Sequence, residues 1–238
     1  AVKFAIEAHR RNKGFCWGSL YWQLGNCWPV SSDSSIDYEG NWKGLHYIVK
    51  KAFEDRLVSG YIHNDTLDVY LVTDRLKPEN GVLDVEVTGF DGKSYSRKSM
   101  KVSVPANAST MVYQTRLEDI LEGADPEASY VRLTYTDGEG VKHSNLRFFR
   151  NQKELDFLRP EIKYDVADNG DYKEVTVVSD VFARAVYLSV SDSELLHFSD
   201  NFFDLHPGQP YTVRVRTDIP AVELKSRLSA RTINSFLY

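Results

Sequence analysis

The spacing of apolar residues divides the chain into an N-terminal part with helical periodicity and a longer part with strand periodicity. Residues 42–57 place apolar side chains three and four positions apart, with Lys and acidic residues between them, which predicts an amphipathic helix. Residues 1–12 also follow a helical pattern, which ends at Lys13-Gly14, where glycine favours a helix stop. Between these helices, the apolar and aromatic residues 15–24 predict a buried strand, and residues 25–41 predict a long loop.

From residue 59 onward the apolar positions alternate, as they do in half-buried strands. We expect strands at 61–63, 67–72, 83–87, 100–104, 109–113, 130–135 and 141–150, with one helical turn at 117–121. After a linker at 151–160, we expect further strands at 161–166, 172–178, 183–190, 211–216 and 221–228. Turn-forming sequences such as Phe90-Asp91-Gly92-Lys93 separate them. Short strands at regular spacing predict two antiparallel sandwiches of immunoglobulin-like size.

This pattern predicts three parts, with boundaries at residues 1–58, 59–152 and 153–238. The first part contains helix, strand, long loop and helix, which is little more than one repeat of an α/β fold. It cannot form a core alone, because its one predicted strand has no neighbour to satisfy its backbone groups. The chain also starts inside a helical pattern, so we expect it to be a piece of a longer protein.

Composition removes several classes of function. The net charge is −5 and no block of Lys or Arg stands out, so we expect neither a nucleic acid nor a membrane as partner. No apolar run approaches the length of a membrane-spanning helix. The two cysteines, Cys16 and Cys27, are expected to be free buried thiols, although a disulfide between them stays open. The histidines are scattered, so we expect no metal site and no cofactor.

Candidate chemistry lies at the end of the predicted strand 15–24. Trp22, Gln23 and Asn26 bring a large aromatic face close to two amides, which is the combination that a sugar site uses. A pyranose presents C–H faces that stack on an indole, and hydroxyls that need donors and acceptors. The competing interpretations are core packing for Trp22 and loop-stabilising amides for Gln23 and Asn26.

Two stretches of this sequence resemble a known family. The first is Trp22-Gln23-Leu24 with Trp28-Pro29, followed by Ser34-Ser35-Ile36-Asp37-Tyr38 and Trp42-Lys43-Gly44-Leu45-His46-Tyr47. The second is Asp200-Asn201-Phe202-Phe203-Asp204-Leu205-His206-Pro207-Gly208. Together they are similar to the C-terminal part of a β-mannosidase of glycoside hydrolase family 2. Gly25-Asn26 stands where the family usually has Asn-Asp.

The resemblance implies a mainly β fold: the last strand and helices of a (β/α)8 catalytic barrel in residues 1–58, then two immunoglobulin-like sandwiches. It also implies that the parent protein is a retaining exo-β-mannosidase acting on a β-mannoside oligosaccharide. Both catalytic glutamates of the family lie on earlier barrel strands. We therefore expect no catalytic residue here, an inactive chain when alone, and the missing N-terminal domains as its partner. Trp22, Gln23 and Asn26 are then expected to bind substrate as one wall of the parent's site.

Other functions stay open at this point. The two sandwiches are also compatible with a stand-alone carbohydrate-binding or adhesion protein, or with a structural spacer. A family 2 glycosidase of another specificity, such as a β-galactosidase or β-glucuronidase, is a further alternative. For the parent protein, a periplasmic, secreted or lysosomal-type compartment is slightly favoured. Asp200 and Asn201 are expected to begin a tight turn rather than bind calcium.

Overall fold

The computed structural model describes residues 1–191 and 195–236 and divides them into two units. The first unit contains residues 1–20 and 50–156, and the second contains residues 21–49 and 157 onward. Helix α2 (Gly44–Ala52) therefore contributes residues to both. No helix in the described ranges has the length and apolar character needed to cross a membrane.

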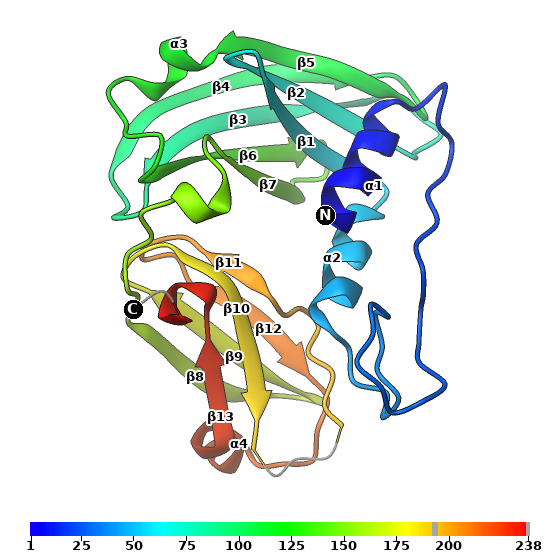
Figure 1. The fold of residues 1–238 in the computed structure, drawn as a ribbon, viewed down its shortest axis with the longest axis vertical. Helices are drawn as coiled ribbons and strands as arrows, with labels where there is room; N and C mark the ends of the chain where they lie inside the picture. The colour runs from blue at the N-terminus through cyan, green and yellow to red at the C-terminus, as the bar shows by residue number, and fades with distance from the viewer. Residues whose placement is uncertain (192–194, 237–238) are drawn as a thin grey trace. The chain divides into compact units, whose positions relative to one another are not determined.

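The first unit is an antiparallel sandwich of two sheets (Figure 1). One sheet has the order β1-β2-β5 and the other the order β4-β3-β6-β7, with every neighbouring pair antiparallel. The strands are β1 (Arg56–His63), β2 (Thr66–Thr73), β3 (Glu79–Gly89), β4 (Ser94–Val104), β5 (Ser109–Arg116), β6 (Ser129–Asp137) and β7 (Lys142–Phe148). The short helix α3 (Leu117–Leu121) confirms the predicted helical turn.

Strict alternation along the strands produces the core of this sandwich. In β3, Leu83, Val85 and Val87 are buried while the residues between them are partly exposed. The same period in β2 and β6 directs apolar side chains to the space between the sheets. The turn between β3 and β4 falls at the predicted Asp91-Gly92, where Gly92 has a φ of 89°. Local alternation and turn chemistry are therefore sufficient to specify this sandwich.

Helix α1 (Val2–Arg11) packs on the first sandwich through a buried carboxylate. Glu7 is fully buried and forms an ion pair with Arg147 of β7. Its Oε1 accepts a hydrogen bond from Asn145 Nδ2 at 2.9 Å, and its Oε2 accepts one from Ser59 Oγ at 3.0 Å. Although burial opposes the charge, Arg147, Lys3 and Asn145 hold the pKa of Glu7 below its ordinary value. A charged network thus attaches the N-terminal helix to β1 and β7.

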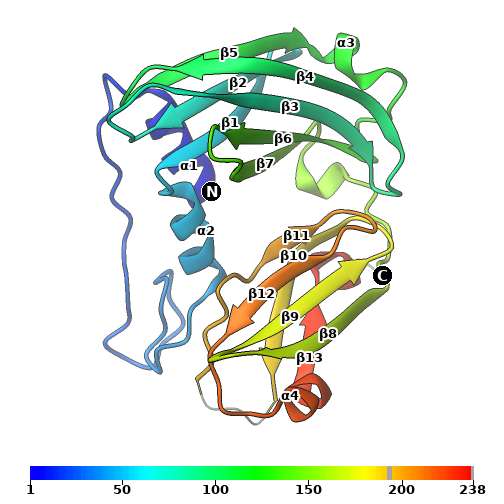
Figure 2. The same cartoon turned by 180° about the vertical axis from the view of Figure 1, so that it is seen from behind.

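The second unit contains another antiparallel sandwich (Figure 2). Its sheets have the orders β12-β9-β8 and β11-β10-β13. The elements are β8 (Ile162–Asn169), β9 (Tyr172–Ser179), β10 (Ala183–Val190), β11 (Phe203–Leu205), β12 (Tyr211–Val215), α4 (Ala221–Arg227) and β13 (Leu228–Arg231). A short 3-10 helix lies at Ile233–Phe236, and another, at Gln152–Glu154, belongs to the first unit. Buried Val, Leu and Phe side chains from both sheets form its core.

The strand predicted at 221–228 is wrong, because most of this segment forms helix α4. Ala221, Leu224 and Leu228 are buried at three- and four-residue spacing, whereas Val222 is 85% exposed. Arg227 also pairs with Glu223 one turn earlier, at 3.0 Å. Helical periodicity therefore decides the local structure here, and the β-branched residue faces outward.

The first 60 residues contain three more corrections. The described backbone at 15–24 forms no named strand, because no neighbouring strand is present to pair with it. The helix predicted at 42–57 ends at Ala52, and Arg56 already begins β1. The cysteines are free, but they are not buried: Cys16 is partly exposed and Cys27 is exposed.

Candidate functional site

The segment 21–43 of the second unit is a long loop whose two arms are hydrogen-bonded to each other. Ser35 N–H donates to Gln23 O at 3.0 Å, and Ile36 N–H donates to Leu24 O at 2.8 Å. The Ser35 side chain is fully buried, and its Oγ donates to Leu24 O at 2.9 Å. Tyr21 Oη lies 3.1 Å from the same Ser35 Oγ. Hydrogen-bonded hydroxyl groups, rather than packed apolar side chains, therefore join the two arms of this loop.

The three predicted substrate-binding residues lie together on the first arm. Trp22 is 85% exposed and is joined to Gln23 by a cis peptide bond. Gln23 and Asn26 are half-buried, and Gln23 Nε2 donates to Asn26 Oδ1 at 3.5 Å. In this chain Trp22 is thus a surface residue beside two mutually oriented amides. Their contact with a sugar stays a prediction.

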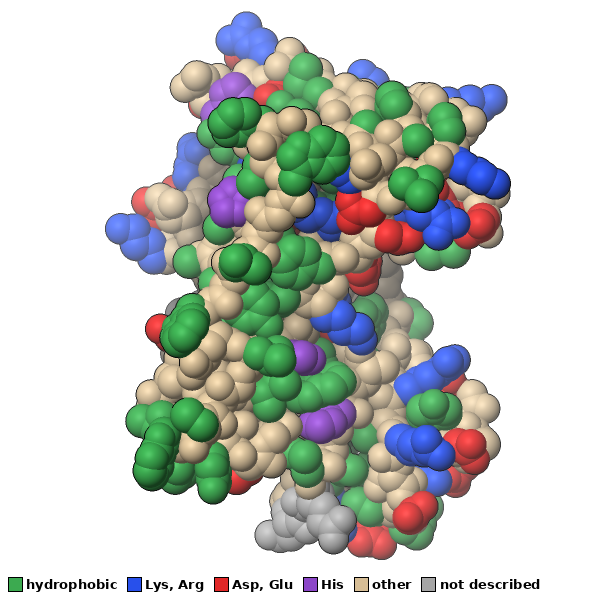
Figure 3. Space-filling view, turned by 90° about the vertical axis from the view of Figure 1, so that its right-hand side faces the viewer, with side chains coloured by type: hydrophobic (Ala, Val, Ile, Leu, Met, Phe, Trp, Pro, Cys, Tyr) green, Lys and Arg blue, Asp and Glu red, His purple; other side chains and the backbone are tan. Residues whose placement is uncertain are grey.

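The exposed Trp22 belongs to a longer apolar run between residues 15 and 30. Figure 3 views the side on which this segment lies and shows hydrophobic side chains at the surface. The exposed members are Phe15, Trp17, Leu20, Trp22, Leu24, Trp28 and Val30. Several large apolar side chains in one segment exceed the scattered exposure that is normal on a protein surface.

The second arm of the loop is attached to the second sandwich by stacked rings. The indole of Trp42 stacks on the imidazole of His197, with centroids 4.3 Å apart and planes at 10°. His46, on α2, contacts the same indole at a centroid distance of 4.5 Å. His197 Nε2 also lies 3.1 Å from Gly40 O, which is part of the loop backbone. The loop is therefore held to the segment that precedes β11.

The two stretches quoted from the sequence meet in this region. The ring of Tyr47, which is buried, lies 6.2 Å from the ring of Phe202. The Tyr47 hydroxyl hydrogen-bonds with the side chain of Asn201 and the backbone of Phe198. Burial raises the pKa of Tyr47 to about 12, and the nearby carboxylate of Asp200 adds to the increase. Residues far apart in the sequence thus form one packed cluster.

Within this cluster, the side chain of Asn201 makes the backbone hydrogen bonds that a neighbouring strand would otherwise make. Its Oδ1 accepts hydrogen bonds from Leu188 N–H at 2.8 Å and from Phe202 N–H at 3.0 Å. Its Nδ2 donates to Leu188 O at 2.9 Å. The backbone bonding expected of these residues is present, because Asp200 Oδ1 accepts the N–H of Asn201 at 2.9 Å; the chain bends at Phe202, but no tight turn is assigned at 200–202. These bonds also hold Phe202 in a left-handed conformation, with a φ of 55°.

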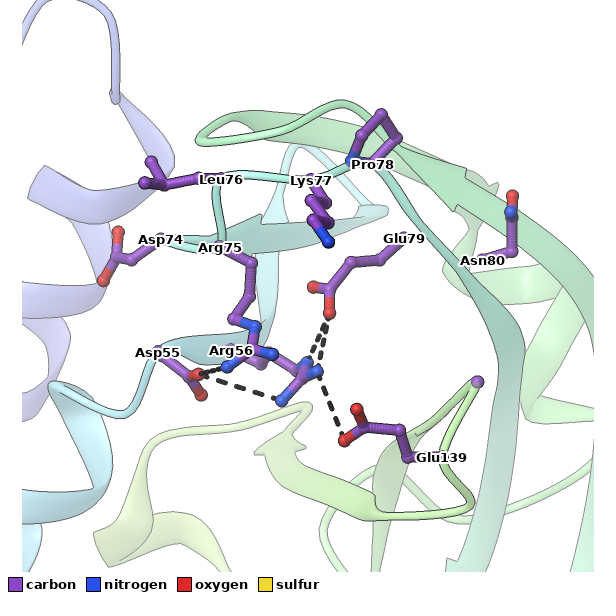
Figure 4. A pocket seen from close by; sticks show the side chains of 11 residues that line it. Asp55, Arg56, Asp74, Arg75, Leu76, Lys77, Pro78, Glu79, Asn80 and Glu139 are labelled. Atoms are coloured by element: carbon purple, nitrogen blue, oxygen red, sulfur yellow. Dashed lines mark hydrogen bonds and ion pairs between the residues drawn. The ribbon is translucent and has the colours of Figure 1, made fainter.

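A separate hollow of about 670 Å³ lies in the first unit, beside the start of β1 (Figure 4). Its lining is mostly charged and includes Arg56, Arg75, Lys77, Asp55, Glu79 and Glu139. Arg56 donates from Nε to Glu79 Oε1 at 2.8 Å, and its Nη2 lies 2.7 Å from the same oxygen. Figure 4 shows Arg56 and Glu79 pointing toward each other. The guanidinium of Arg56 is therefore already paired with a carboxylate of the same hollow.

Behind Arg56 lies the buried Asp137. Burial opposes its charge, but backbone N–H groups of Val141 and Glu139, each at 2.9 Å, hold the pKa of Asp137 below its ordinary value. The carboxylates of Glu54 and Asp137 raise the pKa of His143. The sequence gives no sign of this network of charged side chains, because its members come from four separate segments. Its groups satisfy one another, so it is a structural network. No group of three or more His, Cys, Asp or Glu in the described ranges is arranged to hold a metal ion.

Comparison with known proteins agrees with the fold. Residues 65–154 match the family described as "Mannosidase Ig/CBM-like domain", and residues 157–236 match an "Ig-fold domain" family. Beta-mannosidase A of Aspergillus terreus is 27% identical over 236 residues, covering 89% of this chain and 25% of that protein. The beta-mannosidase of Capra hircus is 30% identical over 216 residues, covering 85% of this chain and 24% of that protein.

Solved structures give the same result. The beta-D-mannosidase from Dictyoglomus thermophilum has a TM-score of 0.87 and 30% identity, covering 98% of this chain and 28% of that one. An exo-chitosanase from Amycolatopsis orientalis, at 17% identity and a TM-score of 0.67, shares the fold. The fold thus defines a mainly β protein with immunoglobulin-like domains. The chain belongs to the β-mannosidase-like proteins of glycoside hydrolase family 2, as their C-terminal part. It spans about a quarter of the length of these relatives.

Proposed function

We propose that this chain is the C-terminal part of a retaining exo-β-mannosidase, and that its loop 21–43 supplies one wall of the sugar site. Residues 1–58 are then the last elements of the (β/α)8 catalytic barrel, followed by two sandwich domains at 59–152 and 153–238. The observation that carries the proposal is the exposed indole of Trp22 beside two amides on a loop with an ordered hydrogen-bonded interior. The β-mannosidase relatives support the choice of substrate.

The exposed apolar run at 15–30 supports the barrel assignment. Leu20 is fully exposed and Leu24 is 61% exposed, and no strand of the described chain pairs with this segment. In a (β/α)8 barrel, such a segment has a strand on each side and helices outside it. The remaining barrel strands would therefore cover these side chains and satisfy the backbone. The missing N-terminal domains of the same protein are the partner that this surface requires.

Trp22 is assigned to the sugar because of its position and its chemistry. In barrel enzymes the active site lies at the C-terminal ends of the strands, and Trp22 lies near that end of the proposed strand. An indole offers an apolar face to the C–H side of a pyranose. Gln23 and Asn26 lie beside it with the hydrogen-bonding capacity that hydroxyls need.

The catalytic carboxylates are assigned to the part of the protein that precedes this chain. A retaining glycosidase needs two carboxyl groups facing each other across the scissile bond. The acids of the loop do not supply such a pair. Asp37 Oδ1 accepts the N–H of Asn41 at 2.7 Å, and Asp37 Oδ2 accepts Asn41 Nδ2 at 2.9 Å. Desolvation raises the pKa of Asp37, but these bonds, with the N–H of Glu39 and the charge of Lys43, together hold it below its ordinary value, so this carboxylate serves to close the loop.

The test compares the full-length protein with the 238-residue chain on a chromogenic β-mannoside. We expect an active full-length protein and an inactive chain. In the full-length protein, Trp22→Ala is expected to lower kcat/KM by roughly 100-fold, which is about 2.7 kcal/mol of transition-state stabilisation. Tyr172→Ala, which removes an exposed ring from the second sandwich, is the matched control and should leave kcat/KM unchanged.

Two results would contradict the proposal. Hydrolysis of a different glycoside, without activity on β-mannosides, would retain the family and overturn the substrate. Hydrolysis by the 238-residue chain alone would show that the carboxylates are assigned to the wrong part of the protein.

A further inference from the structure

The hydrogen bonds around Asn26 determine which way its amide faces. Nδ2 lies 3.1 Å from Val30 O, and a carbonyl oxygen only accepts, so the NH₂ group must be on this side. Oδ1 then faces Ser32 Oγ at 2.6 Å. Because Oδ1 carries no hydrogen, Ser32 must donate its single hydroxyl proton to it. The amide of Asn26 therefore has one defined orientation.

A lysine fixes this arrangement from behind. Lys43 Nζ donates to Ser32 O at 2.9 Å and to Ser34 Oγ at 3.0 Å, and an ammonium group never accepts. Ser34 Oγ in turn donates to Ile36 O at 2.8 Å, and Ser34 N–H donates to Ser32 Oγ at 3.2 Å. Ser34 is 2% exposed, so water has little access to this network. Lys43 thus holds the backbone carbonyl of Ser32 and the hydroxyl of Ser34, and the Ser34 N–H donates to the same Ser32 oxygen that bonds to Asn26.

The orientation of Asn26 sets that of Gln23. Since Asn26 Oδ1 faces it at 3.5 Å, the near group of Gln23 is the Nε2 donor. Gln23 Oε1 is then directed away from Asn26, and no residue in the described part of the chain donates a hydrogen bond to it. Gln23 is half-buried on the same arm as Trp22. The loop therefore presents an oriented carbonyl acceptor beside the exposed indole.

We propose that Gln23 is a specificity-determining residue that accepts a hydrogen bond from one hydroxyl of the bound sugar through Oε1. Asn26 is its positioning residue, and Ser32, Ser34 and Lys43 hold Asn26 in place. This inference rests on the proposed function. It also separates two roles for Gln23: an acceptor suits a sugar hydroxyl, whereas an ionised catalytic glutamate needs a donor.

The test uses the full-length protein and β-mannosides in which each hydroxyl is replaced singly by hydrogen or by fluorine. For every substrate, kcat/KM of the wild type is divided by that of Gln23→Ala, so the intrinsic reactivity of the substrate cancels. We expect a ratio of about 10 with the natural sugar, the size of a neutral hydrogen bond. At one position the ratio should fall to about 1 with hydrogen and also with fluorine, because fluorine cannot donate.

Other outcomes overturn the inference. A ratio that falls with hydrogen but stays near about 10 with fluorine means that Gln23 donates to the sugar. A ratio near 1 for every substrate means that Gln23 makes no such contact. Trp22→Ala in the same assay separates the two levels of the argument. If only Trp22→Ala is impaired, the proposed function survives and the role of Gln23 does not; if Trp22→Ala retains full kcat/KM, both are overturned.

The positioning network is tested with Ser32→Ala and Lys43→Met. Each is expected to lower kcat/KM several-fold in the wild type and to have no further effect in the Gln23→Ala background. Ser32→Thr keeps the hydroxyl and should restore the wild-type value, which also controls for folding. Ser99→Ala, an exposed serine on β4, is the matched control without effect. Losses that persist in the Gln23→Ala background would assign the network to general loop stability and overturn its positioning role.

Discussion

Removing the charge of Glu7 tests how the N-terminal helix is attached to the first sandwich. Glu7→Gln keeps the shape of the side chain but leaves Arg147, whose side chain is only 9% exposed, without its counter-charge. Whichever way the new amide turns, its NH₂ group faces a donor, either Asn145 Nδ2 or those of Arg147 and Ser59. The substitution therefore changes electrostatics and hydrogen bonding without creating a cavity.

The expected loss is about 3 kcal/mol of unfolding free energy, the lower end of the range for removing one partner of a buried ion pair. Urea unfolding is monitored through the amide hydrogen exchange of β2 and β6, so that the measured free energy of unfolding is that of the first unit alone. Glu118→Gln is the matched control, because Glu118 pairs with Arg116 at 3.0 Å while both side chains are about two-thirds exposed. That substitution should cost at most about 1 kcal/mol.

The pH dependence gives the sharper test. The pKa of Glu7 in the folded chain lies below its ordinary value of 4.5, so its stabilising contribution is present above pH 4.5. The contribution disappears as the pH falls through the lower, folded pKa. The difference between wild type and Glu7→Gln should therefore be full at neutral pH and shrink in acid. An equal difference at both pH values, or a loss no larger than that of Glu118→Gln, would refute the charged attachment.

Two further predictions concern the cluster of the second unit. Gly44→Ala places a Cβ 3.3 Å from the ring of Phe202. Although alanine favours helices, this crowding should lower the stability by about 1–2 kcal/mol, as measured by thermal unfolding. The control Gly18→Ala, with open space around it, should be neutral. A stabilised Gly44→Ala variant would contradict this packing. Asn201→Ala leaves the buried N–H and C=O of Leu188 without partners and should cost about 3 kcal/mol in urea unfolding, whereas a loss below about 1 kcal/mol would exclude that bridging role.

The sandwiches could be predicted from the sequence because their information is local. Alternation in 83–87 and a Gly at a left-handed turn position specify β3 and its hairpin without reference to distant residues. Helix α4 was missed for a related reason. The β-branched and apolar residues of 221–228 fit either period, and the decisive feature is that Leu224 faces the core while Val222 faces out.

The segment 15–24 could not be predicted for a different reason. Its apolar composition describes the environment of a strand between two neighbours, and the described chain contains neither. The same composition leaves Leu20 and Trp22 exposed here. A sequence pattern thus reports the surroundings for which the residues are suited; under the proposed barrel assignment, these surroundings lie in another part of the protein.

The candidate site was only half visible in the sequence. Trp22, Gln23 and Asn26 lie within five residues, so their proximity needs no folding argument. Lys43 is 17 positions from Asn26, and nothing in the spacing shows that its ammonium group reaches Ser32 and Ser34. Only the return of the chain at residues 34–36 brings the two arms together.

The second sandwich gains a role from these contacts beyond that of a spacer. Trp42 stacks on His197, and Tyr47 hydrogen-bonds with Asn201, so the arm that carries Lys43 is held by residues of the C-terminal domain. Lys43 in turn donates to Ser32 O and Ser34 Oγ, and Ser32 Oγ bonds to Asn26 of the first arm. If the proposed function holds, a substitution in the C-terminal domain that frees this arm acts on the proposed sugar-binding residues through the loop, without touching a sugar. Under the proposed function, the C-terminal domain would therefore help to order the loop that forms one wall of the sugar site.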